Sequence, residues 1–142
     1  MSRFFEARRK NLTISTDPTR LDVDAIADLL SRSYWANTRT RAQLERALEN
    51  SLVFGLYDKT RQIGLARVVS DYAIFAYLCD VIIHENHRGQ GLGKWLLESV
   101  QNHPDLNVRR WMLVTTDAHG LYEQFGWKLL EKTEKWMMKL ND

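Results

Sequence analysis

A glycine-rich turn between a predicted strand and a predicted helix constrains this chain more than any other feature. Residues 84–94 read HENHRGQGLGK, with glycine at every second position from 89 to 93. Such a turn exposes backbone N–H groups at the start of a helix, and the missing Cβ atoms let a ligand approach closely. Arg88 and Lys94 add positive charge beside those donors. The turn predicts a phosphate or pyrophosphate site; the alternative is a turn that serves only tight packing.

The rest of the chain alternates short strand and helix patterns. Asp22 and Thr40 are predicted helix caps, and Gln43 completes a capping box with Thr40. Asp117 is predicted to cap a later helix that ends before Gly126. This order predicts an α+β fold with one twisted, mixed sheet of about six to seven strands and about four helices. The predicted strands are 11–15, 52–57, 62–69, 73–83, 110–115, 127–130 and 134–140, and the helices begin near 22, 40, 91 and 117.

Composition narrows the class of protein. The 142 residues fit a single domain, 1–142, and 44% of them are apolar, as in a globular protein. The net charge of +2 gives no reason to expect nucleic acid as a partner. No apolar run is long enough for a membrane span, and the N-terminal residues lack a signal peptide pattern. A single cysteine and histidines without ligand spacing predict a cytoplasmic protein with no metal.

Two common nucleotide motifs do not fit the turn. The dinucleotide pattern G-x-G-x-x-G would place its third glycine at Lys94 or Leu96. The P-loop pattern G-x-x-x-x-G-K-[ST] fits Gly93 and Lys94 but has Arg88 at its first glycine and Trp95 at its last position. The pattern that does fit is R-x-x-G-x-G, formed by Arg88, Gly91 and Gly93.

That pattern resembles the acyl-CoA signature of the GNAT superfamily of N-acetyltransferases. Residues 118–127 (AHGLYEQFGW) are similar to a second segment of that family, A-x-x-x-Y-E-x-x-G-F. Element order agrees as well, so the resemblance extends from about residue 11 to 140. It implies acetyl-CoA as co-substrate, and it implies a cofactor site that consists of Val81, Ile82, Ile83, Arg88, Gly89, Gln90, Gly91, Leu92, Gly93 and Lys94.

The resemblance also implies the reaction. An amine attacks the thioester carbonyl directly, and the acetyl group passes from acetyl-CoA to a primary amine of a small molecule. By its place in the second segment, Tyr122 is similar to the tyrosine that protonates the departing thiolate. A tyrosine at helical spacing from Leu121 and Phe125 can equally be a core residue. The alternative function is a catalytically idle acyl-CoA-binding module.

The general base is the open part of this prediction. Asp80 is a carboxylate inside an aromatic and aliphatic strand, where a charge is costly unless it is paired or used. It is the candidate for amine recognition or general base, and an ion pair with Arg67 is the alternative. Strand alternation predicts that Cys79 faces the opposite side from Asp80. His119 is expected on a helix surface.

The acceptor site is expected where the first two helices meet the central strands. Tyr34, Trp35 and Tyr77 offer apolar walls, and Arg39 can hold a substrate carboxylate. These aromatic residues can also simply close the core. The predicted partner is a small, amino-acid-like amine, and exposed edge strands near the C-terminus allow a monomer or a homodimer.

Overall fold

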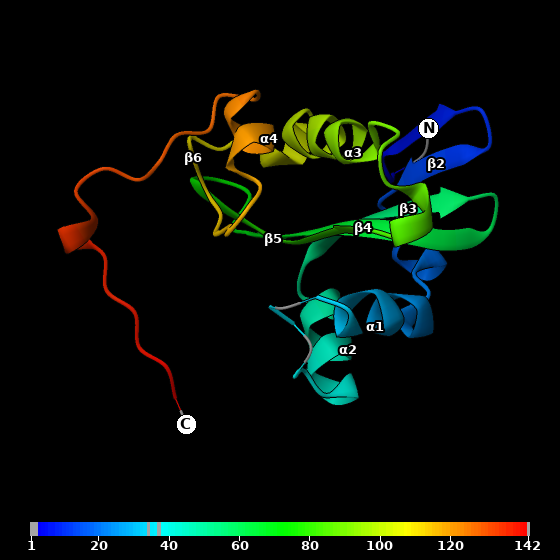
Figure 1. Ribbon diagram of the computed structural model, residues 1–142, viewed down its shortest axis with the longest axis horizontal. Coiled ribbons are helices and arrows are strands. Elements are labelled where there is room, and N and C mark those ends of the chain that lie inside the picture. Colours follow the sequence, from blue (N-terminus) through cyan, green and yellow to red (C-terminus); the bar gives the residue numbers. More distant parts are fainter. Residues whose placement is uncertain (1–2, 34, 37, 142) are drawn as a thin grey trace.

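A six-stranded sheet with helices on both faces forms the body of the protein (Figure 1). The computed structural model describes residues 3–33, 35–36 and 38–141. The strands follow chain order; the first five are antiparallel to their neighbours, and the last runs parallel to the fifth. They are β1 (Glu6–Arg9), β2 (Leu12–Ser15), β3 (Leu52–Asp58), β4 (Arg61–Ser70), β5 (Phe75–Ile83) and β6 (Arg110–Met112).

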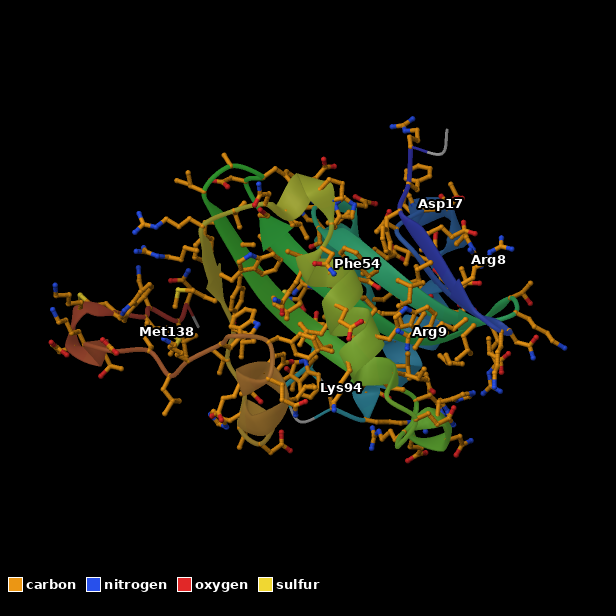
Figure 2. All side chains as sticks on the ribbon, turned by 90° about the horizontal axis from the view of Figure 1, so that it is seen from above. Arg8, Arg9, Asp17, Phe54, Lys94 and Met138 are labelled. Carbon is orange, nitrogen blue, oxygen red and sulfur yellow. The ribbon has the colours of Figure 1, made fainter. Side chains whose placement is uncertain are left out.

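The sheet separates two clusters of buried hydrophobic residues, one on each face, and helices cover both clusters. Helices α1 (Val23–Ser31) and α2 (Arg41–Glu49) cover one face of the sheet, and α3 (Leu92–Gln101) and α4 (His119–Glu123) lie over the other (Figure 1). Two of the three predicted caps are confirmed: the Asp22 carboxylate accepts from the Ala25 N–H, and Thr40 forms a full capping box with Gln43. Phe54 lies beneath α3, which crosses the strands in Figure 2. The α+β class, with one mixed sheet and four helices, is confirmed.

A bulge in β5 changes which face each side chain meets. The β4–β5 register shifts between Leu65 and Arg67, and Asp80 has φ +45°. Before the bulge, Leu78 packs in the cluster beneath α3; after it, Ile82 packs in the cluster against α1 and α2. Strict alternation is therefore lost at this point. The prediction that Cys79 and Asp80 face opposite sides is wrong, because Cys79 lies directly opposite Arg67 in the register and Asp80 accepts a hydrogen bond from the Arg67 side chain.

The C-terminal segment is the main departure from the predicted fold. Residues 127–130 and 134–140 form no strands; they run away from the sheet (Figure 1). Apart from Trp127, which packs against the core, their apolar side chains are exposed: Met137 is 96% exposed and Leu140 is 77% exposed. Alternation makes a strand only where a face is buried and a neighbouring strand accepts the backbone hydrogen bonds. Strand β1 was missed because three of its four residues are charged.

Candidate functional site

The predicted phosphate turn has the backbone geometry that its glycines permit. Gly89 has φ +79° and Gly91 has φ +75°, both in the left-handed region that disfavours side chains with a Cβ. Gly91 is also the N-cap of α3, and no side chain caps this helix end. The first-turn N–H groups of the ten-residue helix therefore remain as donors that can bind an anion.

Hydrogen bonds from the neighbouring loop fix this turn. The Arg88 Nε donates to the Ile83 carbonyl at 3.2 Å, which holds the arginine across the turn. The His84 Nδ1 accepts from the Asn86 N–H at 3.1 Å. Since Arg88 has five N–H donors, the bond to Ile83 leaves most of the guanidinium for an anion.

A cleft of about 550 Å³ runs beside the turn, bounded by β5 and α4. Its lining combines apolar residues of β5 and of the α4 region, among them Leu121 and Ala118, with polar and charged residues such as Arg32 and Asp117. Gln90 and Lys94 of the predicted cofactor site do not line this cleft. The predicted residues that do line it are Val81, Ile82, Ile83, Arg88, Gly89, Gly91, Leu92 and Gly93.

A second cleft of about 470 Å³ lies next to the first. Trp35, Arg39 and Tyr77, three of the four predicted acceptor residues, line it. The fourth, Tyr34, lies outside the described residues. This second cleft, called the acceptor cleft below after the predicted acceptor residues that line it, has aromatic side chains and two arginines in its lining.

Asp80 lies at the base of the acceptor cleft, in a network of three donors. Its Oδ2 accepts from the Arg39 NH1 at 2.6 Å and from the Arg67 Nε at 2.7 Å, and its Oδ1 accepts from the Trp35 Nε1 at 2.9 Å. The carboxylate is 1% exposed. Burial alone would raise the pKa of Asp80, but the hydrogen bonds from Arg39 and Arg67 outweigh burial and lower it. The ion pair with Arg67 is present, and a carboxylate with a lowered pKa is a weak general base.

The two clefts share one wall. Five residues line both of them: Trp35, Val81, Asp117, Ala118 and Tyr122. Tyr122 is 9% exposed, and its ring packs edge-on against Trp127 with 5.8 Å between the centroids. A phenol at this junction can give a proton to a group that is held between the clefts.

Two residues of this site were not predicted as part of it. Asp117 was expected to cap α4, but Ala118 is the N-cap, without a side-chain cap, and the exposed Asp117 lines both clefts instead. Arg67 entered only as an alternative partner for Asp80. A signal for Arg67 was present: it is a charged residue in the otherwise apolar run 63–69 of a central strand.

Neither a cluster of metal ligands nor a membrane-spanning helix occurs among residues 3–33, 35–36 and 38–141. Among them, no three His, Cys, Asp or Glu side chains gather closely enough to hold a metal ion. Within the same ranges, no helix is both long and apolar enough to cross a bilayer.

Comparisons with known proteins agree with this geometry. A family model described as an acetyltransferase (GNAT) domain matches residues 49–129. A protein of Gibberella zeae described as an acetyltransferase is 38% identical over 138 residues, which covers 80% of this chain and 77% of that protein. The range of the family model includes the glycine turn and four of the five residues that line both clefts, all except Trp35.

Solved structures give the same answer. A crystal structure from Xanthomonas campestris pv. campestris, described as a GNAT-family acetyltransferase, has a TM-score of 0.88 and 42% identity, and the match covers 92% of this chain and 93% of that one. A structure from Staphylococcus aureus, described as an acetyltransferase, has a TM-score of 0.72, 22% identity and coverage of 92% and 99%, which shows the fold alone. More than half of the chain lies within the family model, so the protein belongs to the GNAT acetyltransferase family, whose members are acetyl-CoA-dependent acyltransferases.

Proposed function

We propose that this protein transfers an acetyl group from acetyl-CoA to a primary amine of a small molecule. The observation that carries the proposal is the junction of the two clefts. One cleft runs to the anion-binding turn of α3, the other contains arginine and aromatic side chains, and Tyr122 lines both. A donor and an acceptor bound on either side would meet at that junction, which converts the reaction into an effectively intramolecular step.

The cofactor cleft fits coenzyme A in shape and charge. We place its pyrophosphate on the first-turn N–H groups of α3, where the left-handed Gly89 and Gly91 keep side chains away. Arg88 supplies a cation at the same place. The remainder of the cofactor would follow Val81 to Ile83 along β5 toward the junction.

The proposed reaction is direct attack without an acyl-enzyme. The amine nitrogen forms a bond to the thioester carbonyl carbon, and the C–S bond breaks. Tyr122 is the proposed general acid, which gives its proton to the departing thiolate. Asp80 and Val81 have no paired residue in the β4–β5 register. Backbone N–H groups at this bulge are therefore candidates to bind the oxyanion.

The amine must also lose a proton before or during attack. Asp80 is unsuited to this role, because Arg39 and Arg67 lower its pKa. We propose that the proton leaves through water, with the exposed carboxylate of Asp117, the charged member of the shared wall, as the group that assists it. Asp80 then acts as a positioning residue that orients the two arginines.

The proposed test measures release of free thiol from acetyl-CoA in the presence of a panel of amines. We expect Tyr122→Phe to lower kcat by about a hundred-fold or more, the size of a general-acid contribution, and to leave the Kd of acetyl-CoA nearly unchanged. Tyr72→Phe is the matched control, because Tyr72 is 51% exposed and lines neither cleft.

Two outcomes would contradict this account in different ways. Equal turnover of wild type and Tyr122→Phe would remove Tyr122 from the mechanism. Binding of acetyl-CoA without thiol release for any amine would favour the alternative, a catalytically idle acyl-CoA-binding module.

We further propose that the protein acts in the cytoplasm as a monomer or homodimer. Its one cysteine, Cys79, is half-buried and burial raises its pKa, which suits a structural thiol in a reducing compartment. Sedimentation at several protein concentrations distinguishes the two assembly states.

A further inference from the structure

We infer that the acceptor is a zwitterion: an amine that also carries a carboxylate or phosphate, whose anionic group binds Arg39 and Arg67 in the acceptor cleft. This inference rests on the proposed function and names its substrate class. It starts from the charges of the cleft. The charged side chains among its described lining residues are Arg39, Arg67, Asp80 and Asp117.

These four charges are arranged as a positive end and a negative end. Asp80 is 1% exposed, whereas the side chains of Arg39 and Arg67 are 28% and 13% exposed. The buried carboxylate therefore neutralises only one of two cations, and the remaining positive charge faces the cleft. Asp117 makes no described ion pair with either arginine, and it lines the cofactor cleft as well.

The arginines have donors to spare for a second anion. Each guanidinium carries five N–H donors in a planar fork. Arg39 uses NH1 for Asp80, and Arg67 uses Nε for Asp80 and NH1 for the Ser51 hydroxyl at 3.0 Å. The described hydrogen bonds thus use NH1 or Nε and leave the NH2 donors of both arginines for a second anion, such as a carboxylate or phosphate.

If Arg39 and Arg67 served only to stabilise the fold, one of them would be enough to balance Asp80. One arginine balances one buried aspartate, and a second, partly buried cation costs free energy unless an anion joins it. Trp35 fixes the other oxygen of Asp80 at 2.9 Å, so Asp80 cannot rotate away from the arginine pair. Trp35, Arg39 and Arg67 are thereby locked in one arrangement before any acceptor binds, which is the preorganisation that a specific site requires.

The position of this pair fixes how an acceptor would lie. Val81 lines both clefts and directly follows Asp80 on β5. Because Arg39 and Arg67 both donate to the Asp80 carboxylate, the arginine pair is held beside the residue that reaches the junction. The acceptor amine then faces Asp117 and Tyr122, and its anion faces the arginines. The cleft, of about 470 Å³, has room for one amino-acid-sized molecule.

The test compares amines that differ only in the anionic group. L-phenylalanine is paired with 2-phenylethylamine, which suits the aromatic walls, and phosphoethanolamine is paired with ethanolamine. We expect the anionic member of at least one pair to have a kcat/KM about ten- to a hundred-fold higher, the size of a charge-assisted hydrogen bond. The pair that shows the preference identifies the anion as carboxylate or phosphate. Calorimetric binding of the same four compounds repeats the comparison without turnover.

Arginine variants connect the preference to the site. Arg39→Gln and Arg67→Gln are expected to abolish the preference for the anionic member and to leave the Kd of acetyl-CoA unchanged. Arg67→Lys keeps the charge but loses the fork, so it should retain part of the preference if Arg67→Gln fails to fold. Arg41→Gln is the matched control: Arg41 pairs with Asp24 and Glu45 on the surface and lines neither cleft.

The inference and the proposed function fail in distinguishable ways. Equal or better kinetics and binding for both neutral members would overturn the inference and leave the acetyltransferase proposal standing. An anionic preference that persists in Arg39→Gln and Arg67→Gln would also overturn it. Bound amines without thiol release would refute the proposed function, while the calorimetric comparison still decides whether the cleft selects an anion.

Discussion

Alanine substitutions at Gly91 and Gly93 test two separate reasons for glycine in this turn: a left-handed backbone at Gly91 and space for the cofactor at Gly93. Gly91 has φ +75°, and a Cβ added there would meet nothing within 4 Å. The cost of Gly91→Ala is therefore conformational alone, and we expect the free energy of unfolding to fall by about 1 to 2 kcal/mol. Gly93 lies within α3 and its Cβ would meet Leu121 Cδ2 at 4.0 Å, an ordinary contact. Gly93→Ala is expected to raise the free energy of unfolding by about 0.5 kcal/mol or more, because alanine favours a helix over glycine.

At Gly93, the same substitution should change acetyl-CoA affinity and the stability of the free protein in opposite directions. Because Gly93 lines the cofactor cleft, an added methyl group meets the ligand, so Gly93→Ala is expected to weaken acetyl-CoA binding while it stabilises the free protein. Gly120→Ala is the control: Gly120 lies in α4, lines neither cleft, and a Cβ there meets nothing within 4 Å. It should stabilise the fold without changing affinity.

Urea unfolding and calorimetric titration with acetyl-CoA measure these two quantities on the same samples. An unfolding free energy that stays the same or rises in Gly91→Ala would refute the conformational argument. Unaltered acetyl-CoA affinity in Gly93→Ala would refute the placement of the cofactor on this turn.

The remaining predictions concern buried charge. Asp80→Asn leaves Arg39 and Arg67 without their counter-ion and should lower the free energy of unfolding in urea by about 3 kcal/mol; a loss below about 1 kcal/mol would contradict the network. Since the pKa of Asp80 is lowered from 3.8, its contribution is present above that pH and is lost as the pH falls below it. Burial lowers the pKa of His103 from 6.5, so the folded state favours the neutral ring and stability should decrease as the pH falls below 6.5. His103→Asn, which keeps an acceptor for the Asp105 N–H, should flatten the thermal unfolding profile between about pH 7 and 5; an unchanged profile would contradict this assignment.

Local features of the sequence predicted the turn and the helix starts well. A left-handed backbone position favours glycine whatever surrounds it, and a cap needs only the hydrogen bond between residues three apart. Gly91 and the Thr40–Gln43 capping box therefore appear in the structure as predicted.

Features that depend on a partner strand were not predictable in this way. The bulge at Asp80 is set by the register of β4 against β5, which strand alternation does not contain. It brings Cys79 and Asp80 to one cleft, and it lets Arg67 on β4 and Arg39 after α1 meet the same carboxylate. The C-terminal strands were overpredicted for the converse reason, since residues 134–140 have the alternation but no buried face.

Thermal unfolding with acetyl-CoA, beside ATP and NAD, tests the central claim most directly. Acetyl-CoA at about 100 times its Kd should stabilise the protein by roughly 2.7 kcal/mol, which raises Tm by a few degrees for a domain of this size. We predict a rise with acetyl-CoA and none with ATP or NAD. A rise with ATP or NAD and none with acetyl-CoA would contradict the assignment of the glycine turn to coenzyme A.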